Sequence, residues 1–140
     1  MSSIPMNDFD SVIQGILDNI QHPALNWEKV AELKKRTSMQ IRLKGILHPE
    51  DAKLAIANGI DGIIVSNHGG RQLDGVIASI DALPAIVEAV EGKIPILFDS
   101  GIRRGSDIVK AIALGADAVL LGRTFMYGLA VGGQKGCEKG

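Results

Sequence analysis

Four short apolar runs are spaced along the chain, and each follows a stretch in which apolar residues recur at helical spacing. The runs are continuously apolar rather than alternating, which is typical of parallel strands that are buried on both faces. The predicted strands are residues 39–43, 62–66, 94–98 and 118–121. This pattern predicts a parallel α/β fold in which helices separate successive strands.

The stretches between the strands carry the signals expected at helix ends. Pro49 stands at the first position of one predicted helix, and Gly59 closes it. Another helix is expected to begin with Ser106 as its N-terminal cap and to stop at Gly115. The predicted helices are residues 25–37, 48–59, 79–90 and 105–116.

The first of these helices has Leu25, Val30 and Leu33 on one side, and we expect them to form its buried stripe. Residues 1–23 lie upstream and are predicted to be a helical lead-in that has no strand of its own.

An internal repeat supports the α/β interpretation. Residues 55–66 align without gaps on residues 111–122. In both segments a helix leads to a glycine, one connecting residue, an aspartate and then a buried strand. A repeated helix–strand unit predicts a repetitive α/β architecture, and either a (β/α) barrel or a doubly wound sheet satisfies it.

The length of the chain limits how much of a barrel it can form. A complete (β/α)8 TIM barrel takes roughly 250 residues, whereas this chain has 140 residues. It holds about four strand–helix units, and no clear helix is predicted after the fourth strand. As a barrel, residues 24–140 are therefore interpreted as the second, C-terminal half.

Composition excludes several classes of function. A net charge of −1 and 4% aromatic residues give no basis for a nucleic-acid or anionic membrane surface. The single cysteine, Cys137, excludes an internal disulfide and fits a reducing compartment. No apolar run reaches the ~18 residues of a membrane span, and no secretory signal is recognisable, so cytoplasmic location is expected.

The unusual polar clusters all follow apolar runs. They are residues 44–45, 66–71, 99–105 and 122–123. In parallel α/β folds the carboxyl ends of the strands form the active face. We therefore expect these four clusters to meet in one site.

The third and fourth clusters predict a phosphate site. Glycines allow close approach of the backbone, and amides at a helix start favour an anion. Arg103 or Arg104, together with Arg123, can add bidentate contacts. The alternative is that the glycines are turn residues and the arginines are solvated; two adjacent loops of this kind favour phosphate.

The second cluster joins His68 to Arg71 through two glycines. A histidine can accept a proton near neutral pH, and an arginine can hold a carboxylate. This pair suits base-assisted oxidation of a small hydroxy acid. The alternative is that His68 caps a turn and Arg71 pairs with Asp74. Lys44 is either a functional cation or a lysine that extends from a strand end.

Other chemistry is not indicated. No His, Cys or carboxylate grouping has metal-ligand spacing, and no Walker A or G-x-G-x-x-G motif occurs. His22 and His48 each precede a proline and are expected to mark the entry into helices.

The segments KGI, SNHGGRQLDG, DSGIRRGSD and LGR together resemble the FMN-dependent 2-hydroxy acid oxidising enzymes. Within that family, HPEDA, LFDSGIRRG and YGLAVGG are most similar to lactate 2-monooxygenase and lactate oxidase. The resemblance covers residues 24–140 and implies FMN as cofactor, oxidation of a small L-2-hydroxy acid with lactate as the expected substrate, and reoxidation of the flavin by oxygen.

The resemblance also implies roles for individual residues. His68 resembles the catalytic base, Arg71 the clamp on the substrate carboxylate, and Lys44 the cation that stabilises the reduced flavin. The residues that resemble contacts to the flavin ring, the ribityl chain or the phosphate are Ser66, Asp99, Ser100, Gly101, Arg103, Gly122 and Arg123.

The chain departs from the family in two ways. Thr124 stands where the family usually has proline, and the N-terminal half of the barrel, which supplies an aromatic pair near the substrate, is absent. The chain is therefore interpreted as a fragment that needs that half or pairs with itself; the complete enzymes are expected to be homo-oligomers. The alternatives are a non-catalytic half barrel that binds FMN or another phosphate ligand, and a remnant without function.

Overall fold

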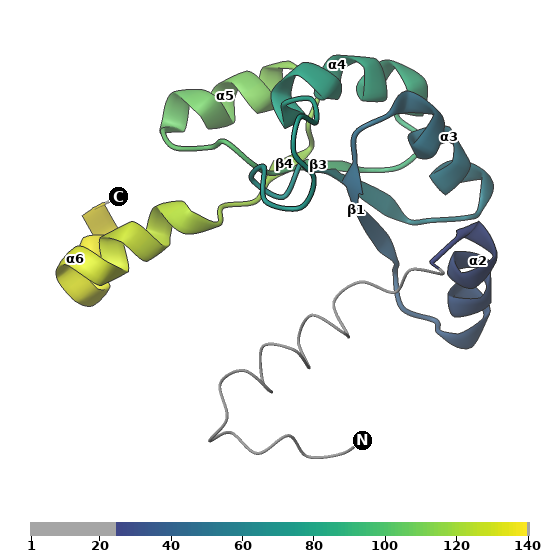
Figure 1. The fold of residues 1–140 in the computed structure, drawn as a ribbon, viewed down its shortest axis with the longest axis horizontal. Helices are drawn as coiled ribbons and strands as arrows, with labels where there is room; N and C mark the ends of the chain where they lie inside the picture. Colours follow the sequence, from purple (N-terminus) through teal and green to yellow (C-terminus); the bar gives the residue numbers. More distant parts are fainter. Residues whose placement is uncertain (1–24, 140) are drawn as a thin grey trace, which may run out of the picture.

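A computed structural model describes residues 25–139, in which four parallel strands form one sheet with the order β1-β2-β3-β4 (Figure 1). The strands are β1 (Arg42–Ile46), β2 (Gly62–Val65), β3 (Ile96–Phe98) and β4 (Ala118–Val119). The helices are α2 (Trp27–Arg36), α3 (Pro49–Ala57), α4 (Ser79–Val90), α5 (Gly105–Ala113) and α6 (Arg123–Lys139). The predicted α/β fold with parallel strands is confirmed. The helical lead-in expected at residues 1–23 lies outside the described residues.

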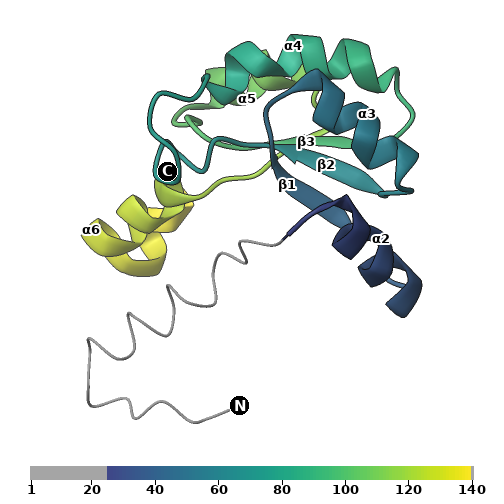
Figure 2. The ribbon, with the colours of Figure 1, turned by 45° about the vertical axis from the view of Figure 1, so that its right-hand side comes forward.

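Helices α3, α4 and α5 lie on the same side of the sheet (Figure 2). The core lies between these helices and the sheet. Side chains that alternate along the strands, Ile63 and Val65 on β2 and Phe98 on β3, are fully buried there together with Leu83 and Ile86 of α4. Such alternation gives each strand one face toward the helices and leaves its other residues on the opposite face of the sheet.

The aspartates of the internal repeat perform the same structural task in each copy. Asp61 precedes β2, and its carboxylate accepts a hydrogen bond from the Ile41 amide at 2.7 Å. Asp117 precedes β4, and its carboxylate accepts from the Ile96 amide, also at 2.7 Å. The backbone amides of both aspartates donate to the carbonyls of those same residues. The repeat therefore fixes the register of neighbouring strands at their amino ends.

Strand β1 is displaced from the prediction. The run 39–43 was expected to be the strand, but the sheet pairing begins at Arg42 and continues to Ile46. The Ile41 backbone is bound instead to Asp61, and Met39 is 74% exposed. Lys44 and Gly45 therefore lie within β1 rather than after it, and the register shifts between Lys44 and Ile46.

Three other expectations about the helices are wrong. The N-cap of α5 is Arg104, not Ser106, because the Asp107 carboxylate accepts the amides that precede the helix. A helix does follow the fourth strand, since α6 begins at Arg123, although non-helical angles at Gly132 and Gly133 interrupt it. In α2 only Val30 is buried, whereas Leu25 and Leu33 are exposed.

Candidate functional site

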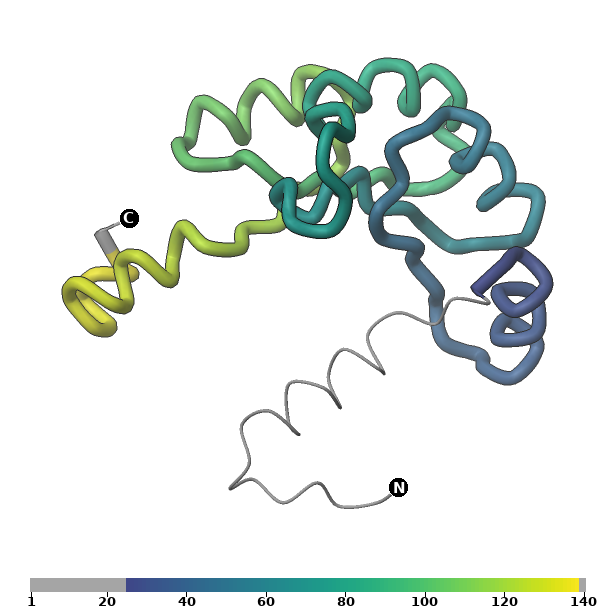
Figure 3. Tube along the Cα trace, viewed as in Figure 1, coloured from purple at the N-terminus to yellow at the C-terminus, as the bar shows by residue number. Residues whose placement is uncertain are grey.

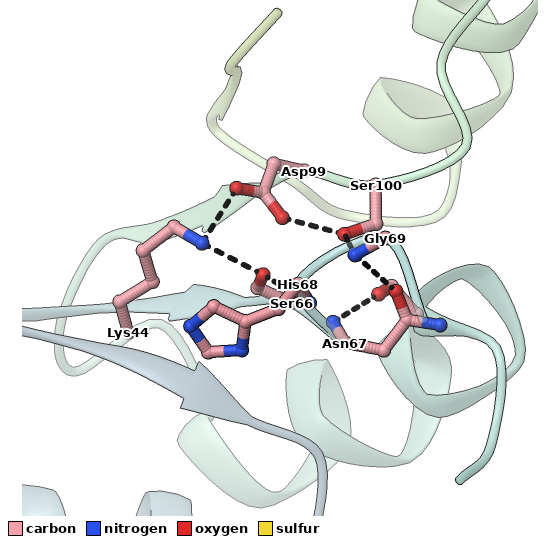
Figure 4. A network of polar contacts seen from close by, with 8 residues as sticks. Lys44, Ser66, Asn67, His68, Gly69, Asp99 and Ser100 are labelled. Atoms are coloured by element: carbon pink, nitrogen blue, oxygen red, sulfur yellow. Dashed lines mark hydrogen bonds and ion pairs between the residues drawn. The ribbon is translucent and has the colours of Figure 1, made fainter. Parts of the chain in front are cut away.

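The centre of the site is Lys44, whose ammonium group reaches from β1 across the ends of two other strands. Its Nζ lies 2.9 Å from the Asp99 carboxylate, directly after β3, and donates at 2.9 Å to the Ser66 hydroxyl, directly after β2. Ser66 is completely buried. Lys44 within β1 and the polar residues directly after β2 and β3 therefore meet in one network (Figure 4).

The Asp99 carboxylate is ionised within this network. Burial favours its neutral form, but hydrogen bonds from Ser66, Lys44 and Ser100 outweigh burial, and the pKa of Asp99 is held below its ordinary value of 3.8. Lys44 and Asp99 therefore form an ion pair at the centre of the network.

His68 occupies a strained turn. Its backbone has a φ of 57°, and its amide donates at 3.1 Å to the Ser66 hydroxyl. An L-residue rarely adopts this left-handed conformation, so the surrounding bonds must hold it. The next amide, of Gly69, donates at 3.0 Å to both the Asn67 side chain and the Ser100 hydroxyl. The backbone amide of Asn67 donates to the hydroxyl of Ser79, the first residue of α4.

Two glycines leave room for neighbouring side chains of the site. A Cβ on Gly45 would lie 3.0 Å from Cε1 of the His68 ring, and a Cβ on Gly69 would lie 2.8 Å from Nη2 of Arg123. Both glycines also have a positive φ. The loop between β2 and α4 thereby lies against the segment that leads into α6 (Figures 1 and 3).

Three arginines face the same cavity without a carboxylate partner. Arg71, Arg103 and Arg123 line a cavity of about 150 Å³ that Lys44, His68 and Asp99 also line. None of the ion pairs within residues 25–139 involves any of the three arginines. The Asp74 carboxylate, the alternative partner for Arg71, accepts instead from the Gly75 amide. A cluster of uncompensated cations favours anionic ligands.

The start of α5 is already partly occupied by a carboxylate. Asp107 Oδ2 accepts from the amides of Arg103 and Arg104 at 3.0 Å each, and these bonds lower the pKa of Asp107. Those two amides lie just before α5 and are not free for an anion, whereas the phosphate site expected at the helix start stays a prediction. A phosphate would depend on the guanidinium groups and on the glycine-rich backbone around Gly101 and Gly122.

A second cavity, of about 450 Å³, adjoins the first one. The two cavities share the residues Gly69, Ser100, Gly101, Ile102, Arg103 and Arg123. The larger cavity also reaches Ser79 of α4 and Lys110 of α5. The space at the strand ends therefore continues past the loop that follows β3.

Sequence reasoning gave no individual structural role to four residues that shape the site. Gly45 provides space for His68, Ser79 and Asn67 fix its turn, and Thr124 donates at 3.0 Å to the carbonyl of Ile102. The Thr124 bond joins the start of α6 to the loop after β3. The pairing of Lys with Gly at residues 44–45 was a usable signal for Gly45, whereas the other contacts depend on the fold.

Comparison with known proteins agrees with this geometry. The family model of the FMN-dependent dehydrogenases matches residues 5–140. The chain belongs to this family. It is 68% identical over 139 residues to an L-lactate oxidase of Lysinibacillus sphaericus (strain C3-41), covering 99% of this chain and 36% of that protein. It is 48% identical over 140 residues to the 2-hydroxyacid oxidase 1 of Homo sapiens, covering 99% of this chain and 38% of that protein.

A solved structure confirms the fold class. The crystal structure of mandelate oxidase with (S)-4-hydroxymandelic acid superposes with a TM-score of 0.78 at 50% identity, covering 82% of this chain and 32% of that one. Such FMN oxidases are TIM barrels, so the expected half of a TIM barrel is confirmed. The chain spans roughly a third of the length of its relatives.

The resemblance to the FMN-dependent family and its cofactor, FMN, are likewise confirmed. Among residues 25–139, no helix is both long and apolar enough to cross a membrane, and no cluster of three metal-ligating side chains occurs.

Proposed function

We propose that this chain supplies the C-terminal half of an active site that oxidises a small L-2-hydroxy acid, with lactate as the substrate. The observation that carries the proposal is the convergence of His68 and three arginines, none of them in an ion pair within residues 25–139, on one cavity at the carboxyl ends of the strands. The 68% identity to an L-lactate oxidase supports lactate within the wider class of hydroxy acids.

The residues fit FMN on chemical grounds. The phosphate of FMN is a dianion, and Arg103 and Arg123 provide two guanidinium groups that no ion pair of residues 25–139 engages. The positive φ of Gly101, with open space around a notional Cβ, leaves the backbone accessible to a ligand. When bound, FMN would supply the acceptor for the two electrons of the substrate.

The other polar side chains divide the remaining work. Arg71 would hold the substrate carboxylate by its planar fork, and His68 would take the proton from the substrate hydroxyl. Lys44 would place positive charge beside the flavin ring while Asp99 and Ser66 hold its ammonium group in place. The protein would thus orient the substrate and set the local charge.

The site is proposed to be completed by the other half of the barrel. The chain spans about a third of its relatives, and a (β/α)8 barrel needs roughly twice the four strands present here. The complementary partner would be the remaining part of the barrel, or a second copy of this chain. The expected cytoplasmic location and the homo-oligomer of the complete enzyme stay predictions.

The test is an anaerobic visible spectrum of the purified chain with FMN, recorded before and after L-lactate. It is repeated with the missing part of the Lysinibacillus L-lactate oxidase added as a separate polypeptide. Bleaching by L-lactate but not D-lactate supports the proposal, and Arg71→Lys should abolish most of it because the ammonium group cannot hold a carboxylate bidentately. Glycolate and (S)-mandelate are compared to test the preference for lactate.

Two results would contradict the proposal. FMN that stays bound but never bleaches, with or without the added half, would favour a non-catalytic flavin-binding module. Failure to retain FMN in either preparation would favour a remnant without this function.

A further inference from the structure

Ser100 keeps a side chain where the backbone favours glycine. Its φ is 80°, the same value as that of the neighbouring Gly101. Residues with a Cβ rarely adopt this conformation, and those that do are held by their surroundings. The serine hydroxyl must therefore provide an interaction that glycine could not.

That hydroxyl makes two directed contacts. It donates to Oδ1 of Asp99 at 2.8 Å and accepts from the Gly69 amide at 3.0 Å. Because Asp99 is ionised, its carboxylate can only accept, so the single hydroxyl hydrogen points to Asp99 and a lone pair faces Gly69. Ser100 and Gly69 are 31 positions apart in the sequence.

The two contacts close a ring of polar contacts that passes through the backbone of His68 (Figure 4). The amide of His68 is bound to Ser66, and the following amide is bound to Ser100. Both serines connect to the same charged pair of Lys44 and Asp99. In order, the ring runs through Lys44, Ser66, His68, Gly69, Ser100 and Asp99.

We propose that Ser100 is a positioning residue for His68: it transmits the fixed position of the Lys44–Asp99 pair to the turn that aims the imidazole. The proposal rests on the function proposed above for His68. Without the Ser100 hydroxyl, the Gly69 amide keeps only the Asn67 side chain as acceptor. The turn then loses its hydrogen bond to the segment that follows β3, and the imidazole gains freedom.

The test separates the hydroxyl from the strained backbone. Ser100→Ala removes the hydroxyl and keeps the strain, whereas Ser100→Gly removes the hydroxyl and relieves the strain. Ser106→Ala, at an exposed serine of α5, is the matched control. Amide hydrogen exchange at Gly69 and the NMR signals of the His68 ring are measured on the full chain without FMN, together with thermal unfolding.

Both Ser100 variants should exchange the Gly69 amide about 3- to 10-fold faster, as expected for loss of one hydrogen bond, and both should shift the His68 ring signals. The glycine variant should unfold at a higher temperature than the alanine variant. The control should leave Gly69 and His68 unchanged.

Three results would overturn the proposal. An unchanged rate of amide hydrogen exchange at Gly69 in both variants would show that the Ser100 hydroxyl does not hold the turn. An effect confined to Ser100→Ala would assign the role to the backbone alone, and altered exchange with unchanged His68 signals would make Ser100 merely structural. Since none of these readouts needs turnover, failure of lactate to bleach the flavin would refute the proposed function separately.

Discussion

Gly45 determines how closely the histidine turn can approach β1. A Cβ at this position would meet Cε1 of His68 at 3.0 Å, and the backbone φ is +102°. We expect Gly45→Ala to lower the free energy of unfolding by about 1–3 kcal/mol, through strain and displacement of the imidazole. Denaturant unfolding and the NMR signals of the His68 ring would measure both effects.

Gly59 provides the control for Gly45. It too has a positive φ, of +70°, but a Cβ there would meet nothing within 4 Å. Gly59→Ala should therefore show the backbone cost without any shift of the His68 signals. If Gly45→Ala and Gly59→Ala give the same NMR signals for the His68 ring, the close approach at Gly45 does not determine the position of the histidine.

The Asp99 carboxylate makes the free energy of unfolding decrease as the pH falls. Its pKa is lowered in the folded chain, so its stabilising contribution is present above the ordinary pKa and is lost as pH falls through the folded value. We expect the difference in unfolding free energy between the native chain and Asp99→Asn to be constant above about pH 5 and to shrink below about pH 4. Urea unfolding at several pH values would measure it.

The comparison must be made as a difference, because Asp61 and Asp107 also have lowered pKa values and contribute their own acid sensitivity. Asp107 lies at the start of α5, and Asp107→Asn serves as a second reference for the pH dependence of the unfolding free energy. A difference for Asp99 that stays constant down to pH 2 would contradict an ionised, hydrogen-bonded carboxylate at this position.

Among the helices and strands, the sequence pattern correctly predicted those whose ends are marked by residues nearby in the sequence. The predicted helix 79–90 coincides with α4, and Pro49 begins α3 as expected. Strand β1 begins later than predicted because the Ile41 amide donates to the carboxylate of Asp61, which is 20 residues away. Helix α6 was not predicted because glycines at 128, 132, 133 and 136 weaken its helical pattern.

The same distinction applies to the site. The polar residues after the strands were recognisable because they break continuous apolar runs. By contrast, Ser79 and Thr124 act on backbone groups 12 and 22 positions away. Such contacts are created by the parallel strand order, so only the folded chain reveals them.

The Thr124 bond joins two elements that would share a phosphate ligand. Its hydroxyl donates to the Ile102 carbonyl, whereas proline, which the family usually has here, could not. We expect Thr124→Val to lower the free energy of unfolding by about 1 kcal/mol and to weaken FMN binding, and Thr124→Ser to retain both. Thermal unfolding and flavin fluorescence titration would measure the effects. Equal behaviour of valine and serine would contradict a role for the hydroxyl.

At the scale of the whole molecule, a four-stranded parallel sheet in this arrangement has two edges, β1 and β4. Near the β4 edge, Leu120, Leu121, Phe125 and Met126 are between 37% and 50% exposed. Exposed edges and apolar side chains favour association. We expect the 140-residue chain to self-associate with rising concentration, as measured by light scattering after size exclusion.

The complementary part of a related barrel should suppress this association if it covers the same surface. A double substitution, Leu121→Lys with Phe125→Lys, is the matched variant, because it should reduce self-association and complementation together. A chain that stays monomeric at every concentration would show that the apolar surface near β4 is not a contact surface.

The two aspartates of the repeat, Asp61 and Asp117, act at the amino ends of the strands, whereas the Lys44 ammonium group meets Ser66 and Asp99 at the carboxyl ends of β2 and β3. Register and chemistry are therefore assigned to opposite rims of the sheet. Because the two are separate, loops at the carboxyl ends of the strands can change in sequence while the strands stay aligned. A designer who seeks altered specificity should accordingly diversify residues 72–78, beyond the proposed site residues, and leave both aspartates unchanged.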